Sequence, residues 1–224
     1  MSRVIIICEG PTEARFISDI LGPYFWSRRI YLHAMLLGVP GQKGGNVKYT
    51  RVRKDILLLL KQDANVFCST MFDLYGLGSG FPGTVPPTGL VAMEKATHIE
   101  NAIREDILRE VPNLRPALRF IPYLQVHEYE GLLFSDTEAF ANALGKANLA
   151  SQLASIRNTF ATPEDINDHP NTAPSKRILA VYPQYNKVIE GTVVAQRIGI
   201  NRMLQECPHF RNWIERLTAL PGGN

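Results

Sequence analysis

The stretch "VIIICEGPTE", Val4–Glu13, joins an apolar run directly to two carboxylates. Its β-branched residues stop at a glycine and a proline, which interrupt regular structure, so the run predicts a short buried strand. A helix is expected next, because apolar residues recur there at helical spacing. Glu9 therefore stands where the strand ends, and Glu13 lies on the first turn of the helix.

Similar apolar runs, separated by amphipathic segments, continue along the first half of the chain. They predict strands at residues 30–37, 66–72 and 118–126 and helices at residues 48–62 and 90–110. Pro122 places the last of these strands near an edge of the sheet, because proline cannot donate a ladder hydrogen bond. Strands that alternate with helices predict an α/β fold with a mostly parallel sheet flanked by helices.

The second half of the chain has a different pattern. Residues 136–224 hold short helical patterns and a turn-rich segment, with no further strong strand. We therefore expect an α/β core over residues 1–135 and a helical C-terminal lobe over residues 136–224, packed on the core within one domain. Phe210, Trp213 and Leu217 form an apolar stripe near the end, which fits either a core or a protein interface.

Composition narrows the class of protein. The chain has 224 residues, of which 45% are hydrophobic and 20% charged, as in ordinary globular proteins, and a formal charge of +3 does not by itself indicate nucleic acid. Its three cysteines form neither a zinc motif nor an even disulfide framework. Two of them lie inside apolar runs, where we expect buried thiols. No apolar stretch approaches the roughly 20 residues of a membrane span, and the start lacks a secretion signal. A cytoplasmic protein with no membrane partner is expected.

Acidic side chains follow three of the predicted strands. Glu9 ends the first, Asp73 ends the third, and Glu128 and Glu130 follow the fourth, while Glu13 lies close to the same edge. Because chemistry in parallel sheets gathers beyond the carboxyl ends of the strands, we expect these acids to converge. Crowded carboxylates repel one another, and a hard divalent cation such as Mg²⁺ or Mn²⁺ removes that repulsion.

Each of these acids also has a purely structural interpretation. Glu13 interacts favourably with a helix N-terminus, Asp73 is a good turn former before the glycine-rich loop, and the segment around Glu128 and Glu130 can begin a helix. A single acid at a strand end is therefore weak evidence. Agreement among three strand ends is stronger evidence for a metal site.

Basic residues cluster in two places. Lys43 lies in the glycine-rich segment "GVPGQKGGN", and Lys48 and Arg51 lie at or near the start of the following helix. Lys176 and Arg177 lie in the turn "TAPSKR". These residues can hold the backbone of a polyanion, although a solvated helix face or a helix cap explains them about as well. The glycine-rich segment does not match a nucleotide P-loop, and "HEYE" lacks the second histidine of a zinc protease.

Several motifs together resemble a known family. "CEGPTE", "MFDLYG", "FIPYLQVHEYEGLLF", "APSKRI" and "ECPHFRNWIERL" resemble the bacterial family catalogued as domain of unknown function 4276, nearly end to end. That family is similar to toprim domains, the metal-binding catalytic module of topoisomerases, primases and certain nucleases. The resemblance also implies an ABC- or AAA-type ATPase partner in phage-defence gene pairs.

The toprim resemblance implies roles for individual residues. Toprim domains carry a glutamate after the first strand, matched by Glu9, and a D-x-D pair after the third, whose first aspartate is matched by Asp73. The sequence departs from that pattern at Tyr75, which removes one metal ligand unless Glu128 or Glu130 replaces it.

The expected function is a magnesium-dependent nuclease subunit that cleaves phosphodiester bonds in DNA or RNA. In that interpretation Glu9 or Glu13 acts as general base beside the metal. Two alternatives remain open: a catalytically weak subunit that docks on an ATPase, and a metal-dependent phosphohydrolase acting on a small molecule.

Overall fold

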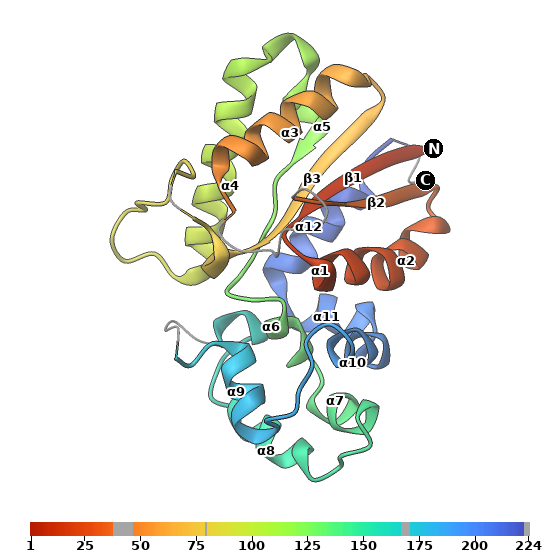
Figure 1. Ribbon diagram of the computed structural model, residues 1–224, viewed down its shortest axis with the longest axis vertical. Helices are drawn as coiled ribbons and strands as arrows, with labels where there is room; N and C mark the ends of the chain where they lie inside the picture. The colour runs from red at the N-terminus through yellow and green to blue at the C-terminus, as the bar shows by residue number, and fades with distance from the viewer. Residues whose placement is uncertain (38–46, 79, 167–170, 222–224) are drawn as a thin grey trace.

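The computed structural model describes residues 1–37, 47–78, 80–166 and 171–221, and it shows a parallel sheet with helices on both faces and a group of helices below it (Figure 1). The strands are β1 Ser2–Cys8, β2 Ile30–Leu36, β3 Val66–Asp73, β4 Phe120–Ile121 and β5 Leu124–Gln125. Their order is β2-β1-β3-β4, β5 also pairs with β3, and these pairings are all parallel. The predicted α/β fold with a mostly parallel sheet is confirmed.

The register of the central strands brings their carboxyl ends to one edge. Cys8 at the end of β1 lies beside Leu36 of β2 and beside Met71 of β3. The residues that follow, Glu9 on one strand and Asp73 on the other, therefore emerge from the same edge of the sheet.

The fourth strand is shorter than the sequence pattern predicts. Residues 116–119 form the helical turn α5 Pro116–Arg119, and the remainder is divided at Pro122 into β4 and β5. The Thr70 hydroxyl fills this gap, because its oxygen accepts a hydrogen bond from the Tyr123 amide and donates one to the Tyr123 carbonyl, both at 2.9 Å. A proline without an N–H group thus interrupts the ladder, and a side chain of β3 replaces the lost backbone pairing. The expected place of Pro122 at an edge is confirmed.

Two hydrophobic clusters lie on opposite faces of the sheet. On one face, Ile7 and Phe72 pack with α3 Tyr49–Gln62 and α4 Ala92–Glu110. On the other, Val4 and Ile6 pack with the continuous helical segment formed by α1 Pro11–Arg15, the π-helix η1 Phe16–Leu21 and α2 Gly22–Trp26, and with α12 Pro208–Thr218. The alternation of side chains along β1 supplies both clusters.

The chain beyond the sheet is helical, as predicted. It contains α6 Glu130–Leu133, α7 Thr137–Ala143, α8 Leu149–Arg157, the 3₁₀ turn η4 Pro163–Asp165, α9 Pro174–Val181, α10 Glu190–Ile198 and α11 Ile200–Glu206. Two further 3₁₀ turns, η2 Leu74–Gly76 and η3 Pro112–Leu114, lie earlier in the chain. The helices α6 to α11 form the lower part of the molecule in Figure 1. Within the described ranges, no helix is both long and apolar enough to cross a membrane.

The last helix, α12, leaves this group and returns to the sheet. Phe210, Trp213 and Leu217 are each at most 1% exposed, and the Trp213 indole donates to the Ser69 hydroxyl of β3 at 2.9 Å. The residue that ends the described part of the chain, Pro221, therefore lies beside β1, where the Ser2 hydroxyl donates to its carbonyl. The interpretation of the apolar stripe as a protein interface is wrong, because the stripe fills the core.

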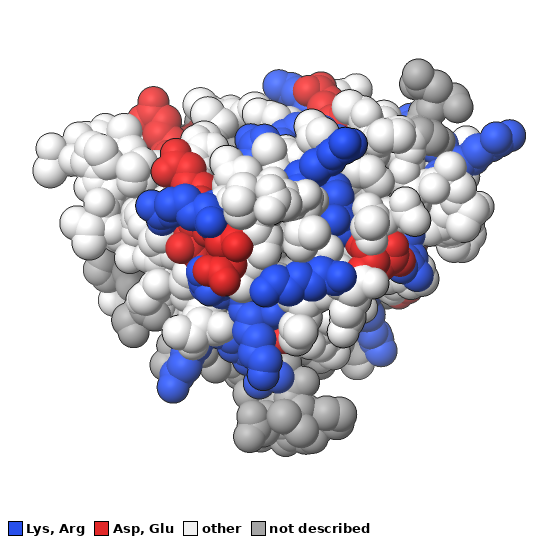
Figure 2. Space-filling model, turned by 90° about the horizontal axis from the view of Figure 1, so that it is seen from above, with Lys and Arg blue, Asp and Glu red and all other residues white. Residues whose placement is uncertain are grey.

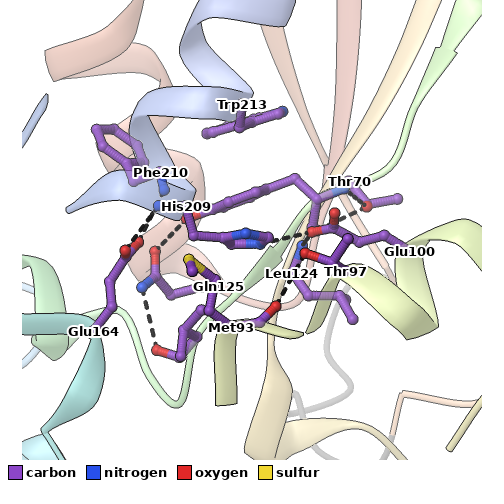
Figure 3. A network of polar contacts seen from close by, with 12 residues as sticks. Thr70, Met93, Thr97, Glu100, Leu124, Gln125, Glu164, His209, Phe210 and Trp213 are labelled. Carbon is purple, nitrogen blue, oxygen red and sulfur yellow. Dashed lines mark hydrogen bonds and ion pairs between the residues drawn. The ribbon is translucent and has the colours of Figure 1, made fainter. Parts of the chain in front are cut away.

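A buried polar network holds the start of α12 in place (Figure 3). His209 Nε2 lies 2.9 Å from Glu100 Oε1 on α4, and the same carboxylate oxygen accepts the Leu124 amide of β5 at 2.8 Å. The Glu164 carboxylate accepts the backbone amides of His209 and Phe210 at 2.8 and 2.9 Å. The network thus joins the sheet, α4, η4 and α12, and leaves none of these groups buried without a partner.

The three cysteines are buried and form no disulfide. Burial, together with the nearby Glu13 carboxylate, raises the pKa of Cys8 to about 12. Such thiols stay protonated and pack as small apolar groups, as the sequence predicts.

Candidate functional site

An open pocket of about 410 Å³ lies at the carboxyl edge of the sheet. Its wall carries acids from three strand ends, namely Glu9 after β1, Asp73 at the end of β3 and Glu128 after β5, and Glu13 from α1. The structure thus brings together four of the five acids that the sequence singles out. We call these four side chains the acidic rim.

Glu130, the fifth acid, lies beneath the pocket rather than in its wall. It is the first residue of α6, as the helix-start interpretation predicts, and it is 0% exposed. Its carboxylate oxygens accept no hydrogen bond of good geometry from the part of the chain that the structure describes. Lys187 Nζ lies 3.1 Å from Glu130 Oε2, and this ion pair compensates the buried charge.

Lys187 is the residue that sequence reasoning missed. It lies between α9 and α10, and its ammonium is 3.4 Å from Asp73 Oδ2 and 3.7 Å from Glu13 Oε1, in addition to the contact with Glu130. A lone lysine in the segment "QYNKVIE" carries no motif, and only the fold of the lobe brings it to the edge of the sheet. The helical lobe therefore supplies the site with its central positive charge.

Two glycines determine the positions of Glu9 and Glu13. A Cβ on Gly76 would lie 2.8 Å from Glu9 Oε2, so only glycine lets the carboxylate approach this closely. Gly10 donates its amide to Glu13 Oε2 at 3.1 Å, which closes a capping interaction at the start of α1. The structural and functional interpretations of Glu13 are compatible, because one oxygen caps the helix and the other faces Lys187.

Backbone amides orient the next two acids. Tyr129 donates to Asp73 Oδ1 at 3.0 Å, and Asp73 Oδ2 is left facing Lys187. Ser175, in the first turn of α9, donates to Glu128 Oε2 at 3.0 Å. The motif "APSKRI" thus places a helix N-terminus against the acidic rim, where it favours negative charge.

Crowding and burial shift the pKa values at this site. Burial raises the pKa of Asp73 to about 8, and its acidic neighbours add to the effect while Lys187 opposes it. Burial is also the main reason that the pKa values of Glu9 and Glu130 are raised. Burial would lower the pKa of Lys187, but the surrounding carboxylates outweigh it and raise that pKa. Three carboxyl groups of the site thus share the single Lys187 ammonium.

The donors at this site suit a hard divalent cation in chemistry and charge. They are carboxylate oxygens, and neighbouring acids add to the burial that raises the pKa values of Glu9 and Asp73. Among the described residues, no three Asp, Glu, His or Cys side chains are already arranged as ligands of one metal ion. The carboxylates are instead gathered around the Lys187 ammonium.

The predicted substrate-binding residues have different surroundings. Lys48 and Arg51 are exposed at the start of α3, where Arg51 Nε lies 3.9 Å from Asp55 Oδ2, and Lys176 is exposed on α9. Arg177 donates to the Thr172 carbonyl at 2.8 Å and packs over the Phe160 ring, which is a structural role. Lys43 and its glycine-rich segment lie outside the described residues.

Charge at the far end of the molecule is mixed. Figure 2 shows the end away from the helical lobe, where Lys and Arg side chains are interspersed with Asp and Glu. Elsewhere Arg53 of α3 is paired with both Asp106 and Glu110 of α4 at 2.7 Å. Basic residues of this kind support helix packing, so the number of lysines and arginines alone does not locate a polyanion site.

The fold and site define a parallel α/β protein with an acidic pocket at the carboxyl ends of its strands. The chain belongs to the family described as domain of unknown function 4276, which matches residues 8–218. No curated protein and no solved structure matches the chain significantly.

Proposed function

We propose that the protein is a metal-dependent nuclease subunit of the toprim-like kind, which cleaves phosphodiester bonds in nucleic acid. The observation that carries the proposal is the convergence of Glu9, Asp73 and Glu128, from three strand ends, in one pocket. In the same pocket the pKa values of Glu9 and Asp73 are raised. Crowded carboxylates repel one another, and a purely structural role of each acid does not explain why so many lie together in one pocket.

Mg²⁺ or Mn²⁺ would be held by Glu9, Asp73 and Glu128, whose side chains line the pocket. When bound, the ion supplies Lewis acidity and positive charge next to the phosphate. Glu130 supports this site from below through Lys187 and is not exposed to the pocket. Because Tyr75 stands where toprim domains carry a second aspartate, Glu128 would complete the set of ligands.

The chain's own residues supply the remaining chemistry. Either Glu13, or Glu9 in place of its role as a metal ligand, accepts a proton from the attacking water, since both line the pocket. Burial raises the pKa of Glu9 toward the range in which a carboxylate is an effective base. Lys187 provides a fixed positive charge that stabilises the charge developing on the phosphate. Lys48, Arg51 and Lys176, which are exposed, can contact the nucleic-acid backbone.

The resemblance adds two further elements to the proposal. The protein is proposed to act in the cytoplasm with an ABC- or AAA-type ATPase as its partner in phage defence. The assay for activity therefore includes the ATPase encoded beside this gene, with and without ATP.

The test is cleavage of plasmid DNA, single-stranded DNA and total RNA in Mg²⁺ or Mn²⁺. We expect Asp73→Asn and Glu9→Gln to lose about 100-fold or more of the activity while remaining folded. The matched controls are Asp19→Asn and Glu138→Gln, which change exposed acids outside the pocket. Cleavage by Asp73→Asn at the wild-type rate would contradict the proposal. Absence of cleavage under all conditions would favour the non-catalytic docking subunit.

A further inference from the structure

A second pocket, of about 340 Å³, lies next to the acidic one. Its wall is mostly apolar and includes Leu74, Leu77, Pro86 and Ile99. Tyr75 lines both pockets, so its side chain stands between the apolar pocket and the acidic rim. One ligand can therefore occupy both pockets at once, with one part in the apolar pocket and another at the acidic rim.

Contacts with His127 fix the position of the Tyr75 ring. It stacks on the His127 ring with centroids 5.4 Å apart and planes at 27°, and the Tyr75 amide donates to the His127 carbonyl at 3.3 Å. His127 adopts a left-handed backbone conformation with φ at 60°, which is uncommon outside glycine and typical of functional sites. The Tyr75 side chain is nevertheless 39% exposed, so part of it remains accessible to a ligand.

We propose that the apolar pocket holds one unpaired base of a nucleic-acid strand whose phosphate lies at the acidic rim. A volume of about 340 Å³ is near the lower end of ligand sites, roughly 300 to 1,000 Å³, and suits a single ring system. Apolar walls beside an accessible aromatic ring suit the faces of a base, and Lys95 in the same wall suits an adjoining phosphate or a base carbonyl.

This inference rests on the proposed function and narrows its substrate. A base in a duplex is stacked and paired, and entry into such a pocket requires its removal from the stack. A base in a single strand enters without that penalty. The pocket therefore selects single-stranded nucleic acid, or a duplex position where the base is unpaired.

The test is a binding measurement that does not depend on cleavage. Fluorescence anisotropy in Ca²⁺, which also binds carboxylate oxygens, compares a short labelled single strand, the same strand in a duplex, and the strand with abasic positions. We expect the intact single strand to bind about 10-fold more tightly than either of the others, because stacking of one base on an aromatic ring is of that order.

Two variants test the pocket itself. Tyr75→Ala removes the aromatic surface, and Ala92→Phe fills the pocket at the start of α4. Each is expected to weaken binding of the intact strand by about 10-fold and to leave binding of the abasic strand unchanged. The matched control is Tyr31→Ala on β2, because Tyr31 is 37% exposed and lies on the edge strand. Melting temperatures show whether each variant is folded.

Failure of this inference is distinguishable from failure of the nuclease proposal. Equal binding of the three ligands, no binding at all, or an unchanged affinity in both variants would overturn the base pocket, whatever is cleaved. Tight, base-dependent binding without cleavage under any condition would support the pocket and count against the nuclease.

Discussion

Lys187 contacts carboxylates from α1, β3 and α6, so a single side chain of the lobe neutralises part of the charge at the sheet edge. Its ammonium stabilises the carboxylates through these ion pairs, and it also occupies the space between them. In the proposed metal site, a divalent cation and the lysine would therefore compete for the same oxygens. Stability and metal affinity are expected to change in opposite directions when this residue is altered.

We predict that Lys187→Met destabilises the metal-free protein by about 3 kcal/mol, because the buried Glu130 carboxylate loses its ion pair. Mg²⁺ should raise the melting temperature of this variant more than that of the wild type, because the ammonium no longer competes. Thermal unfolding in EDTA and in a magnesium titration measures both effects. Lys61→Met, at an exposed position of α3, is the control. Equal magnesium shifts in variant and wild type would exclude competition.

Gly76 offers a test of the geometry of Glu9. In Gly76→Ala the new methyl group would lie 2.8 Å from Glu9 Oε2, so the carboxylate must move. The fold is expected to survive, since the displaced atoms are the end of a flexible side chain, but affinity for Mg²⁺ should fall about 10-fold. Gly22→Ala is the control, because a Cβ there would lie at an ordinary distance of 3.5 Å from the Ile17 carbonyl oxygen. Unchanged magnesium-dependent melting in Gly76→Ala would contradict the proposal that Glu9 is a metal ligand.

At the scale of elements, the position of α12 depends on the polar network at its first turn. His209, Glu100 and Glu164 are all buried, and Figure 3 shows how their hydrogen bonds link α12 to its neighbours. Burial would lower the pKa of His209, but the hydrogen bond and charge of Glu100, with the charge of Glu164, raise it. Burial raises the pKa of Glu164. The attachment of α12 is therefore sensitive to pH.

The sign of this effect follows from the raised pKa of His209. Its contribution to stability is fully present below the unfolded value of about 6.5 and is lost as the pH rises through the folded pKa. The free energy of unfolding should therefore decrease as the pH rises above about 6.5. His209→Gln should remove this dependence and, by leaving Glu100 without its charged partner, cost about 3 kcal/mol at pH 6. Glu164 adds a decrease of the same sign at lower pH.

Urea unfolding at several pH values between 6 and 9 measures this dependence. The control is His33→Gln, because His33 is exposed on β2. Parallel pH profiles for His209→Gln and the wild type would show that the ion pair does not govern the attachment of α12.

At the scale of the whole molecule, the sheet and the lobe share one core. The cluster that contains Val4 and Ile6 of β1 also contains Trp213 of α12 and helices of the lobe, so the last helix completes a layer begun by the first strand. The acidic pocket lies where these two parts meet, and Lys187 comes from the lobe. A disturbance of α12 should therefore affect the folding of the whole chain and not only of its end.

The two tryptophans of the chain provide a matched comparison. Trp213 is 1% exposed and Trp26 is 59% exposed. Trp213→Ala should destabilise the protein by about 3 to 5 kcal/mol, because it leaves a large cavity beside the sheet. Trp26→Ala should change stability by only about 0.5 kcal/mol. Urea unfolding followed by circular dichroism measures both, and a small effect of Trp213→Ala would contradict a shared core.

The sequence by itself determined the elements and the edge of the sheet at which the candidate site lies. Runs of β-branched residues specify strands locally, and parallel strands necessarily end at one edge, so the meeting of Glu9, Asp73 and Glu128 follows from their positions after strands. The helical character of residues 136–224 is also a local property. The fourth strand is shorter than its sequence predicts. The helical turn at its start, and the Thr70 hydroxyl that takes the place of a backbone hydrogen-bond partner, depend on contacts with other parts of the chain.

Only the tertiary structure decided which residues complete the site. Lys187 reaches the acids because the lobe folds back on the sheet, and Glu130 is buried because α6 begins beneath the pocket. The second pocket depends on α4 and the loop after β3 meeting beside Tyr75. The physical reason is the same in each case. Contacts between residues far apart in the chain leave no local period or spacing in the sequence, because they depend on how complete elements pack.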